Sequence, residues 1–160
     1  MRKRGQFDIS FGMIFSIIII IAIIGVAFYV ITNFLQTSKC AEIGLFYDDL
    51  RKDIDKAWEA TKYRDSFTGT LSSGVEMVCF GDSSQTPGEY KKEFDELVRG
   101  GGRGHNVFIS PKKEACDVSL ASIKLEHAKT DQFFCVNVND KKLSIKMEKN
   151  VFDSLVSIKK

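Results

Sequence analysis

Few residues of this 160-residue chain have the type and spacing that catalysis requires. The two histidines, His105 and His127, are the candidate general acids or bases, yet neither belongs to a recognisable serine or cysteine nucleophile motif. The stretch GGGRGH, residues 100–105, lacks the Lys-Ser/Thr of a phosphate-binding loop and fits a surface loop. We therefore expect no catalytic residue, no cofactor and no enzymatic activity.

The four cysteines, Cys40, Cys79, Cys116 and Cys135, are the other residues with chemical potential. They contain no C-x-x-C pair, which argues against a metal site. An even number of cysteines in a small domain fits two disulfides, and four cysteines allow three pairings. We favour Cys79–Cys135, both in predicted strands, and Cys40–Cys116, which would tie a helix to a loop. Free buried thiols are the alternative.

A long apolar segment precedes all of these residues. No charged residue occurs from Ile9 to Ser38, and a membrane-spanning helix needs about 20 apolar residues. The run exceeds the roughly 7–15 apolar residues of a cleaved secretory signal. Lys39 stands where a lipoprotein signal has a small residue before its cysteine, Cys40. We expect this segment to remain in the mature protein as a membrane helix, with membrane lipid as a partner.

Charge predicts the orientation of that helix. Arg2, Lys3 and Arg4 precede it and only Lys39 follows closely, so the positive-inside rule places the N-terminus in the cytoplasm and the rest outside. Residues 40–160 carry 19 basic and 20 acidic side chains, a net charge of −1. Such a balance does not favour binding to nucleic acid.

The outer domain begins with a helical pattern and continues with strand-like segments. Apolar residues recur at three- and four-residue steps as far as about Tyr63, which predicts an amphipathic helix with one face to bury. These apolar positions are Ile43, Phe46, Tyr47, Leu50, Ile54, Ala57 and Trp58. The clearer strand candidates are residues 75–80, 106–110, 133–138 and 142–147, and the less regular ones are 118–127 and 154–158.

Two local signals complete the predicted architecture. Asn139-Asp140-Lys141 predicts a hairpin between the strands at 133–138 and 142–147. Thr86-Pro87-Gly88-Glu89 predicts a helix start with a capping box, and Gly100 predicts its end. The expected fold is α+β: a long N-terminal helix, part transmembrane and part amphipathic, packed on a small antiparallel sheet.

The N-terminus carries the most specific signal. The residues Arg4-Gly5-Gln6 are followed by a short, partly polar stretch and then by the apolar helix. This arrangement resembles the class III signal peptide of archaeal type IV pilin-like proteins. In that family a prepilin peptidase cuts between Gly and Gln on the cytoplasmic side, which implies cleavage between Gly5 and Gln6. The resemblance divides the chain into a leader (1–5), a transmembrane or assembly helix (6–38) and an extracytoplasmic domain (39–160).

Cleavage at this point would remove three basic residues that are costly in an apolar interior. The new Gln6 amine would remain positive, and Asp8 is the only acid within the first 41 residues. We hypothesise that Asp8 pairs with the Gln6 amine of its own or a neighbouring chain. The alternative is that Asp8 simply lies at the membrane interface.

Two functions follow as expectations. The first is a pilin-like subunit, major or minor, of an archaeal cell-surface filament or related assembly, with other pilin-like subunits and a prepilin peptidase-like enzyme as partners. The second is a single-pass anchor that displays a disulfide-linked binding or adhesion domain outside the cell and does not polymerise.

Overall fold

The computed structural model describes residues 11–99 and 102–160 and divides the chain into two compact units, residues 1–36 and 37–160. Helix α1 (Phe11–Glu59) supplies all the described residues of the first unit and the first 23 residues of the second. The fold is α+β, as expected, with a long apolar N-terminal helix and a small β domain.

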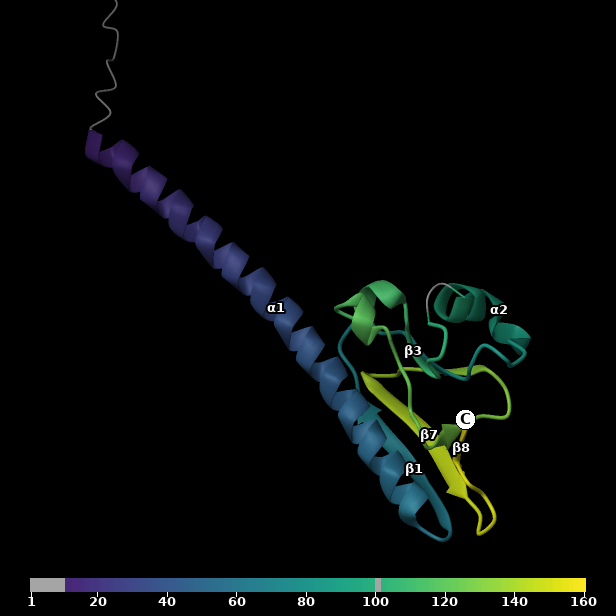
Figure 1. Cartoon of the computed structure of the whole chain (residues 1–160). Coiled ribbons are helices and arrows are strands. Elements are labelled where there is room, and N and C mark those ends of the chain that lie inside the picture. The colour runs from purple at the N-terminus through teal and green to yellow at the C-terminus, as the bar shows by residue number, and fades with distance from the viewer. Residues whose placement is uncertain (1–10, 100–101) are drawn as a thin grey trace, which may run out of the picture. The chain divides into compact units, whose positions relative to one another are not determined.

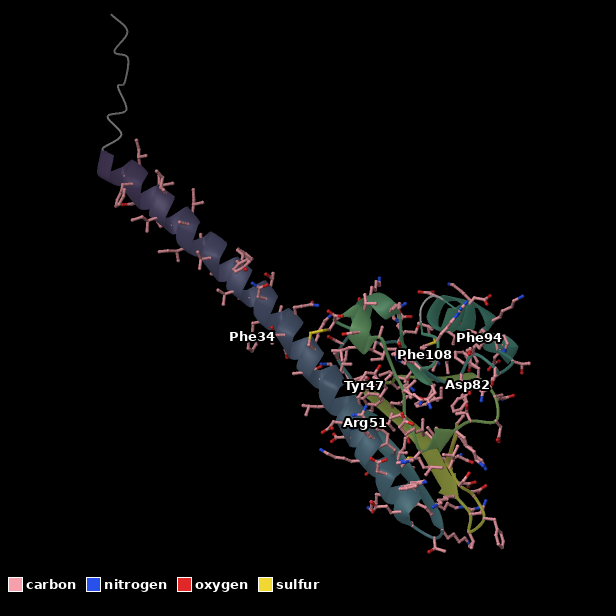
Figure 2. All side chains as sticks on the ribbon, viewed as in Figure 1. Phe34, Tyr47, Arg51, Asp82, Phe94 and Phe108 are labelled. Atoms are coloured by element: carbon pink, nitrogen blue, oxygen red, sulfur yellow. A yellow bond between two sulfur atoms is a disulfide. The ribbon has the colours of Figure 1, made fainter. Side chains whose placement is uncertain are left out.

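The described residues of the first unit form no core of their own. All its side chains from residue 12 onward are exposed, including the large apolar ones; Phe34, for example, is 70% exposed. Figure 2 shows Phe34 projecting from α1, whereas Tyr47 lies among packed side chains. The mean hydropathy of its most apolar 18-residue window is 3.1, so this helix is long and apolar enough to cross a membrane.

The described residues of the second unit form two four-stranded sheets rather than the single sheet that the sequence predicted (Figure 1). One sheet has the order β1-β7-β8-β5, all antiparallel except the β5–β8 pair, and the other has the antiparallel order β4-β3-β2-β6. The strands are β1 (Tyr63–Thr70), β2 (Met77–Phe80), β3 (Val107–Ser110), β4 (Ser122–Ile123), β5 (Ala128–Lys129), β6 (Phe134–Asn137), β7 (Lys142–Lys149) and β8 (Val156–Lys159).

The second-unit part of α1 packs on the first sheet. Six of the seven apolar positions predicted for its inner face are at most 4% exposed: Ile43, Phe46, Tyr47, Leu50, Ile54 and Ala57. Opposite them, strand β7 alternates cleanly and buries Leu143, Ile145 and Met147. Gly69 in β1 allows the close approach, because a Cβ there would lie 2.6 Å from the ring of Phe46. This core fixes the helix to the sheet.

The central strands of the second sheet, β2 and β3, are buried on both faces. Val78 and Phe80 of β2 join the main core, while Cys79 between them lies in a smaller cluster with Phe94, Leu97, Val98, Phe108, Phe133 and Cys135. A strand buried on both faces needs apolar residues at consecutive positions. This explains why the sequence around Cys79 is a continuous apolar run, whereas β7 alternates.

The predicted hairpin between β6 and β7 is wrong, although its turn is present. Asp140 and Lys141 have positive φ values of 50° and 62°, and Asn139 and Lys142 pair across them. Beyond this bridge the strands separate, because β6 pairs with β2 while β7 pairs with β1 and β8. The turn therefore connects two sheets.

Helix α1 is shorter than predicted, and the strand after it was not predicted. The helix ends at Glu59, where the Lys149 ammonium donates to the carbonyl oxygens of Trp58 and Ala60. Strand β1 starts at Tyr63 and pairs with β7 along all eight of its residues. Its sequence, YRDSFTGT, is mostly polar because its outer face is exposed.

The second helical segment also differs from expectation. It comprises η1 (Gly88–Tyr90), α2 (Lys91–Phe94) and η2 (Asp95–Arg99), so regular α-helix covers only four residues. Pro87 occupies the N-cap position without a side-chain cap, so the predicted capping box does not form. Gly100, the predicted helix end, lies outside the described residues.

The 118–127 segment is not the continuous strand that its residue types indicated. It forms η4 (Val118–Leu120) and the two-residue strand β4, and β5 follows at Ala128. Asp117 caps η4 by accepting a hydrogen bond from the Ser119 amide, and this bond lowers the pKa of the Asp117 carboxyl. Side chain-to-backbone bonding of this kind competes with strand formation.

One buried hydroxyl attaches this segment to α1. Tyr47, 4% exposed, donates its hydroxyl hydrogen to the carbonyl oxygen of Leu120 at 2.9 Å, and burial raises the pKa of this phenol. We expect Tyr47→Phe to lower the free energy of unfolding by about 1–3 kcal/mol, because the Leu120 carbonyl would lose its partner. Chemical denaturation measures this. Exposed Tyr29, in the first unit, gives the matched control, and Tyr29→Phe should leave the stability unchanged.

Candidate functional site

The residues of the predicted peptidase site, Gly5 and Gln6, and the predicted charge partner Asp8 lie outside the described residues. Their roles remain predictions from the sequence. The candidate sites that the structure does describe are the apolar surface of α1, the two disulfides, the surroundings of the histidines, a pocket and an exposed turn.

The apolar surface of α1 in the first unit surrounds the whole helix. Exposed large side chains occur from Met13 to Leu35 without a charged residue between them. Two of its hydroxyl groups are satisfied within the helix, since Ser16 donates to the Gly12 carbonyl and Thr32 to the Tyr29 carbonyl. Water hydrates such a surface poorly, so the helix is suited to lipid or to contact with other apolar helices.

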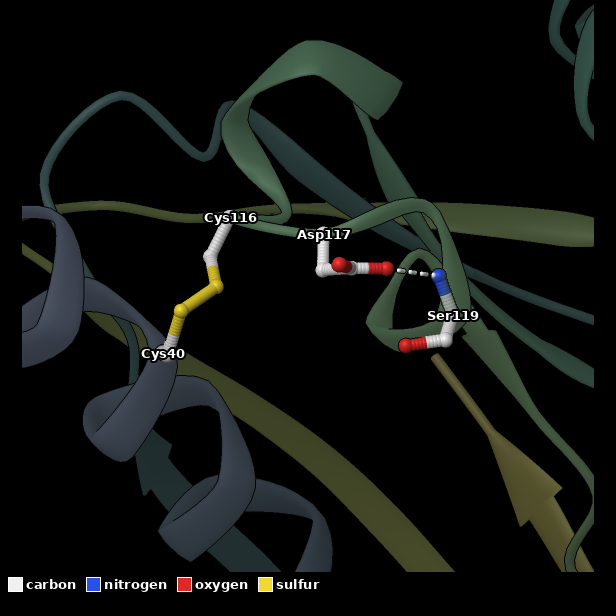
Figure 3. The surroundings of a disulfide bond; sticks show 4 residues. All are labelled: Cys40, Cys116, Asp117 and Ser119. Carbon is white, nitrogen blue, oxygen red and sulfur yellow. Dashed lines mark hydrogen bonds between the residues drawn. A yellow bond between two sulfur atoms is a disulfide. The ribbon is translucent and has the colours of Figure 1, made fainter.

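A disulfide and an ion pair hold the start of the second-unit helix to the β domain. Cys40 of α1 is bonded to Cys116, in the loop that precedes Asp117 (Figure 3). Next to it, Lys39 lies 2.9 Å from the Glu114 carboxylate and lowers the pKa of that carboxyl. A covalent bond at this point prevents the helix from separating from the domain at its first turn.

The second disulfide lies inside the second sheet. Cys79 of β2 and Cys135 of β6 face each other in register and form a disulfide with a Cα–Cα separation of 3.9 Å. Both residues are at most 1% exposed. The two disulfides are the pairings that the sequence analysis favoured, and no cysteine of the chain is free.

The histidines have partners, and each makes one polar side-chain contact among the described residues. His127 stacks on Trp58 with ring centroids 3.9 Å apart, and its Nδ1 lies 2.8 Å from Asp55 Oδ1. His105 Nδ1 lies 2.7 Å from the Ser122 hydroxyl. A nucleophilic triad needs a hydroxyl and a carboxylate on one imidazole, and the interactions among the described residues give each histidine only one of them. Those residues also contain no cluster of ligands suited to a metal ion.

A pocket of about 590 Å³, hereafter the β8 pocket, opens beside the end of β8. It forms where the chain leaves β5, which is paired with β8, and crosses to β6 in the other sheet. Its lining residues are Gly88, Glu89, Tyr90, Asp131, Gln132, Phe133, Phe134, Ile158, Lys159 and Lys160. The aromatic and aliphatic lining residues give the pocket an apolar floor, and acidic and basic side chains lie around its opening. The volume is within the range of pockets that bind small ligands.

The turn between β7 and β8 displays two apolar residues, hereafter the Phe152 knob: Val151, 58% exposed, and Phe152, 99% exposed. Asn150 and Asp153 close this turn through a backbone hydrogen bond and two bonds to the Asp153 carboxylate. Lys129 forms an ion pair with the same carboxylate at 3.0 Å. These bonds lower the pKa of Asp153, the Asn150 amide first among them, and keep the knob extended from the domain.

Sequence reasoning missed both the knob and the pocket. An Asn-x-x-Asp sequence is a turn signal that could have located the knob at residues 150–153. The pocket has no such signal, because three separate segments of the chain form it.

The fold and these sites define an α+β protein with an exposed apolar helix long enough to span a membrane and a domain held by two disulfides. No family model, curated protein or solved structure matches this chain.

Proposed function

We propose that this chain is a type IV pilin-like subunit, major or minor, of an archaeal surface filament or a related assembly. Its N-terminal helix holds it in the membrane before incorporation, and the same helix bundles with those of other subunits afterwards. The carrying observation is that residues 12–36 are exposed and uncharged on every side, whereas the α1 residues after Cys40 bury one face in a complete core. A helix of this kind presents an apolar surface on every side, which suits burial in lipid or against other apolar helices.

Processing at Gln6 agrees with this division of the chain. Removal of residues 1–5 eliminates three basic side chains next to the apolar helix, and Asp8 remains to offset the new amine. The intact mass of the protein from its native membranes tests this step. We expect a chain that begins at Gln6 and is lighter than its reduced form by the four hydrogens of two disulfides. A chain that retains Lys3 and Arg4 would contradict the proposed processing.

The role of Asp8 gives a separate prediction. Asp8→Ala should leave the membrane anchor intact but reduce the filament yield by about tenfold or more, because the Gln6 amine would enter the helix bundle without an opposite charge. Asp8→Glu keeps the charge and is the matched control. Electron microscopy of sheared filaments, with immunoblots of the membrane fraction, measures both quantities. Wild-type filament yield in Asp8→Ala would refute the pairing.

The second candidate is a single-pass anchor that displays a binding domain without polymerising. The β8 pocket favours it, because an open pocket with an apolar floor is suited to a ligand. Filaments that contain this chain would decide in favour of the first candidate. A processed chain that stays monomeric in the membrane at its native abundance would decide in favour of the second.

A further inference from the structure

We propose that the Phe152 knob of one copy inserts into the β8 pocket of a second copy, so that the β domains of neighbouring subunits are joined head to tail. The proposal identifies an interface of the filament and therefore rests on the proposed function. Three features support this contact: the exposure of the knob, the composition of the pocket and their positions on one strand.

The exposure of the knob is the first observation. Burial of a phenylalanine side chain is strongly favourable, and in the free chain Phe152 is 99% exposed and forgoes nearly all of this stabilisation. The turn nevertheless holds the side chain outward through Asn150, Asp153 and Lys129. A rigid turn has already lost the entropy that a flexible loop would lose on binding, so insertion of the knob costs little ordering.

The composition of the pocket is the second observation. Phe133, Phe134 and Ile158 form a floor that matches an aromatic ring, and about 590 Å³ is enough for Phe152 with the neighbouring Val151. Beside the floor, the Lys159 ammonium is paired with Glu148 and the Lys160 ammonium donates to the Tyr90 hydroxyl, so both basic groups already have polar partners. The polar opening and apolar floor resemble the polar rim and apolar core of a protein interface.

The positions of the two features are the third observation. Strand β8 begins four residues after Phe152, and its last residues line the pocket. In Figure 1 the yellow turn after β7 and the C-terminus lie apart along this strand, so a copy cannot fill its own pocket without unfolding β8. When each copy inserts its knob into the pocket of a different neighbour, rather than exchanging knobs with a single partner, the contact is heterologous. Such contacts extend into helical filaments unless the rotation between subunits closes a ring.

The size of the contact explains why it needs the rest of the filament. An aromatic side chain buries about 150–250 Å², whereas a stable interface buries about 1,200–2,000 Å² in total. The knob alone therefore does not hold two copies together in solution. Bundled apolar helices raise the effective concentration of neighbouring domains, and at that concentration a small contact fixes their register.

A photoreactive phenylalanine analogue at position 152 of the full-length chain, in native membranes and in sheared filaments, tests the proposal. We expect crosslinks between copies, mapped by mass spectrometry to residues 88–90, 131–134 or 158–160. The matched control is the same analogue at Val118, which is 76% exposed on a different segment and should not reach those residues. Gln132→Trp fills the pocket from an exposed position and should lower the crosslink yield by about tenfold.

The outcomes separate this proposal from the proposed function. Filaments with crosslinks from position 152 into the pocket support both. Filaments in which position 152 crosslinks elsewhere, or to lipid, overturn the knob contact and leave the pilin-like function standing. Crosslinks into the pocket without filaments support the contact and overturn the filament. If neither filaments nor crosslinks between copies are found, both the knob contact and the pilin-like function are overturned.

Discussion

Replacement of both Cys79 and Cys135 by alanine is expected to lower the free energy of unfolding of the β domain by about 4 kcal/mol. The bond joins residues 56 positions apart, and loop-closure entropy for a loop of that length gives about this value. Loss of two buried sulfur atoms adds a cavity term, because both residues are at most 1% exposed. The total free energy of unfolding of a protein domain is about 5–15 kcal/mol, so this variant would lose a large part of its stability.

Trp58 provides the readout, because it is the only tryptophan and stacks on His127 in the folded domain. Denaturant titration of the full-length protein in detergent, followed by tryptophan fluorescence, gives the stability of each variant. Cys40→Ala with Cys116→Ala is the matched control. This double variant should lose a similar stabilisation from loop-closure entropy, because Cys40 and Cys116 are 76 residues apart. It should lose little further stability through a cavity, since both residues are partly exposed. A loss below about 1 kcal/mol for the Cys79 and Cys135 pair would contradict the stabilising role.

Ile24→Lys is expected to leave the chain in the membrane but to abolish filaments. The 18-residue apolar window contributes roughly −5 to −11 kcal/mol to insertion at about −0.3 to −0.6 kcal/mol for each residue. One lysine at the centre costs about 3 kcal/mol, which leaves insertion favourable. In lipid the lysine can extend toward the interface, but in the proposed helix bundle its charge would be buried in every subunit.

Membrane flotation and electron microscopy separate the two effects. Ile24→Leu retains the apolar surface and should behave like the wild type in both assays. Leu45→Lys places the same charge on α1 beyond Cys40, at a side chain 62% exposed, and should allow both anchoring and folding. Filaments of normal yield from Ile24→Lys would mean that this helix surface is not buried by other subunits. The chain would then fit the single-pass anchor better.

Much of the fold was predictable where one pattern has one physical solution. The inner face of α1, from Ile43 to Ala57, follows the helical period, and β7 alternates because one face is buried and the other exposed. The sequence analysis missed strand β1 because only two of its eight residues, Phe67 and Gly69, are buried, so the sequence shows no clear alternation. The strand is held in place by its pairing with β7. The hairpin was wrong because a turn signal at Asp140-Lys141 fixes the reversal of the chain but not the partner of each strand.

By itself, the sequence determined the apolar helix, the helical face that would be buried, most of the strands and the even set of cysteines. These follow from composition and periodicity, which act over a few neighbouring residues. Only the tertiary structure decided that the strands divide into two sheets and that Cys79 lies opposite Cys135 on neighbouring strands of one sheet. It also decided that a pocket opens where the chain crosses from one sheet to the other. It also left Phe152 uncovered. Each of these depends on residues far apart in the chain, whose proximity no local pattern encodes.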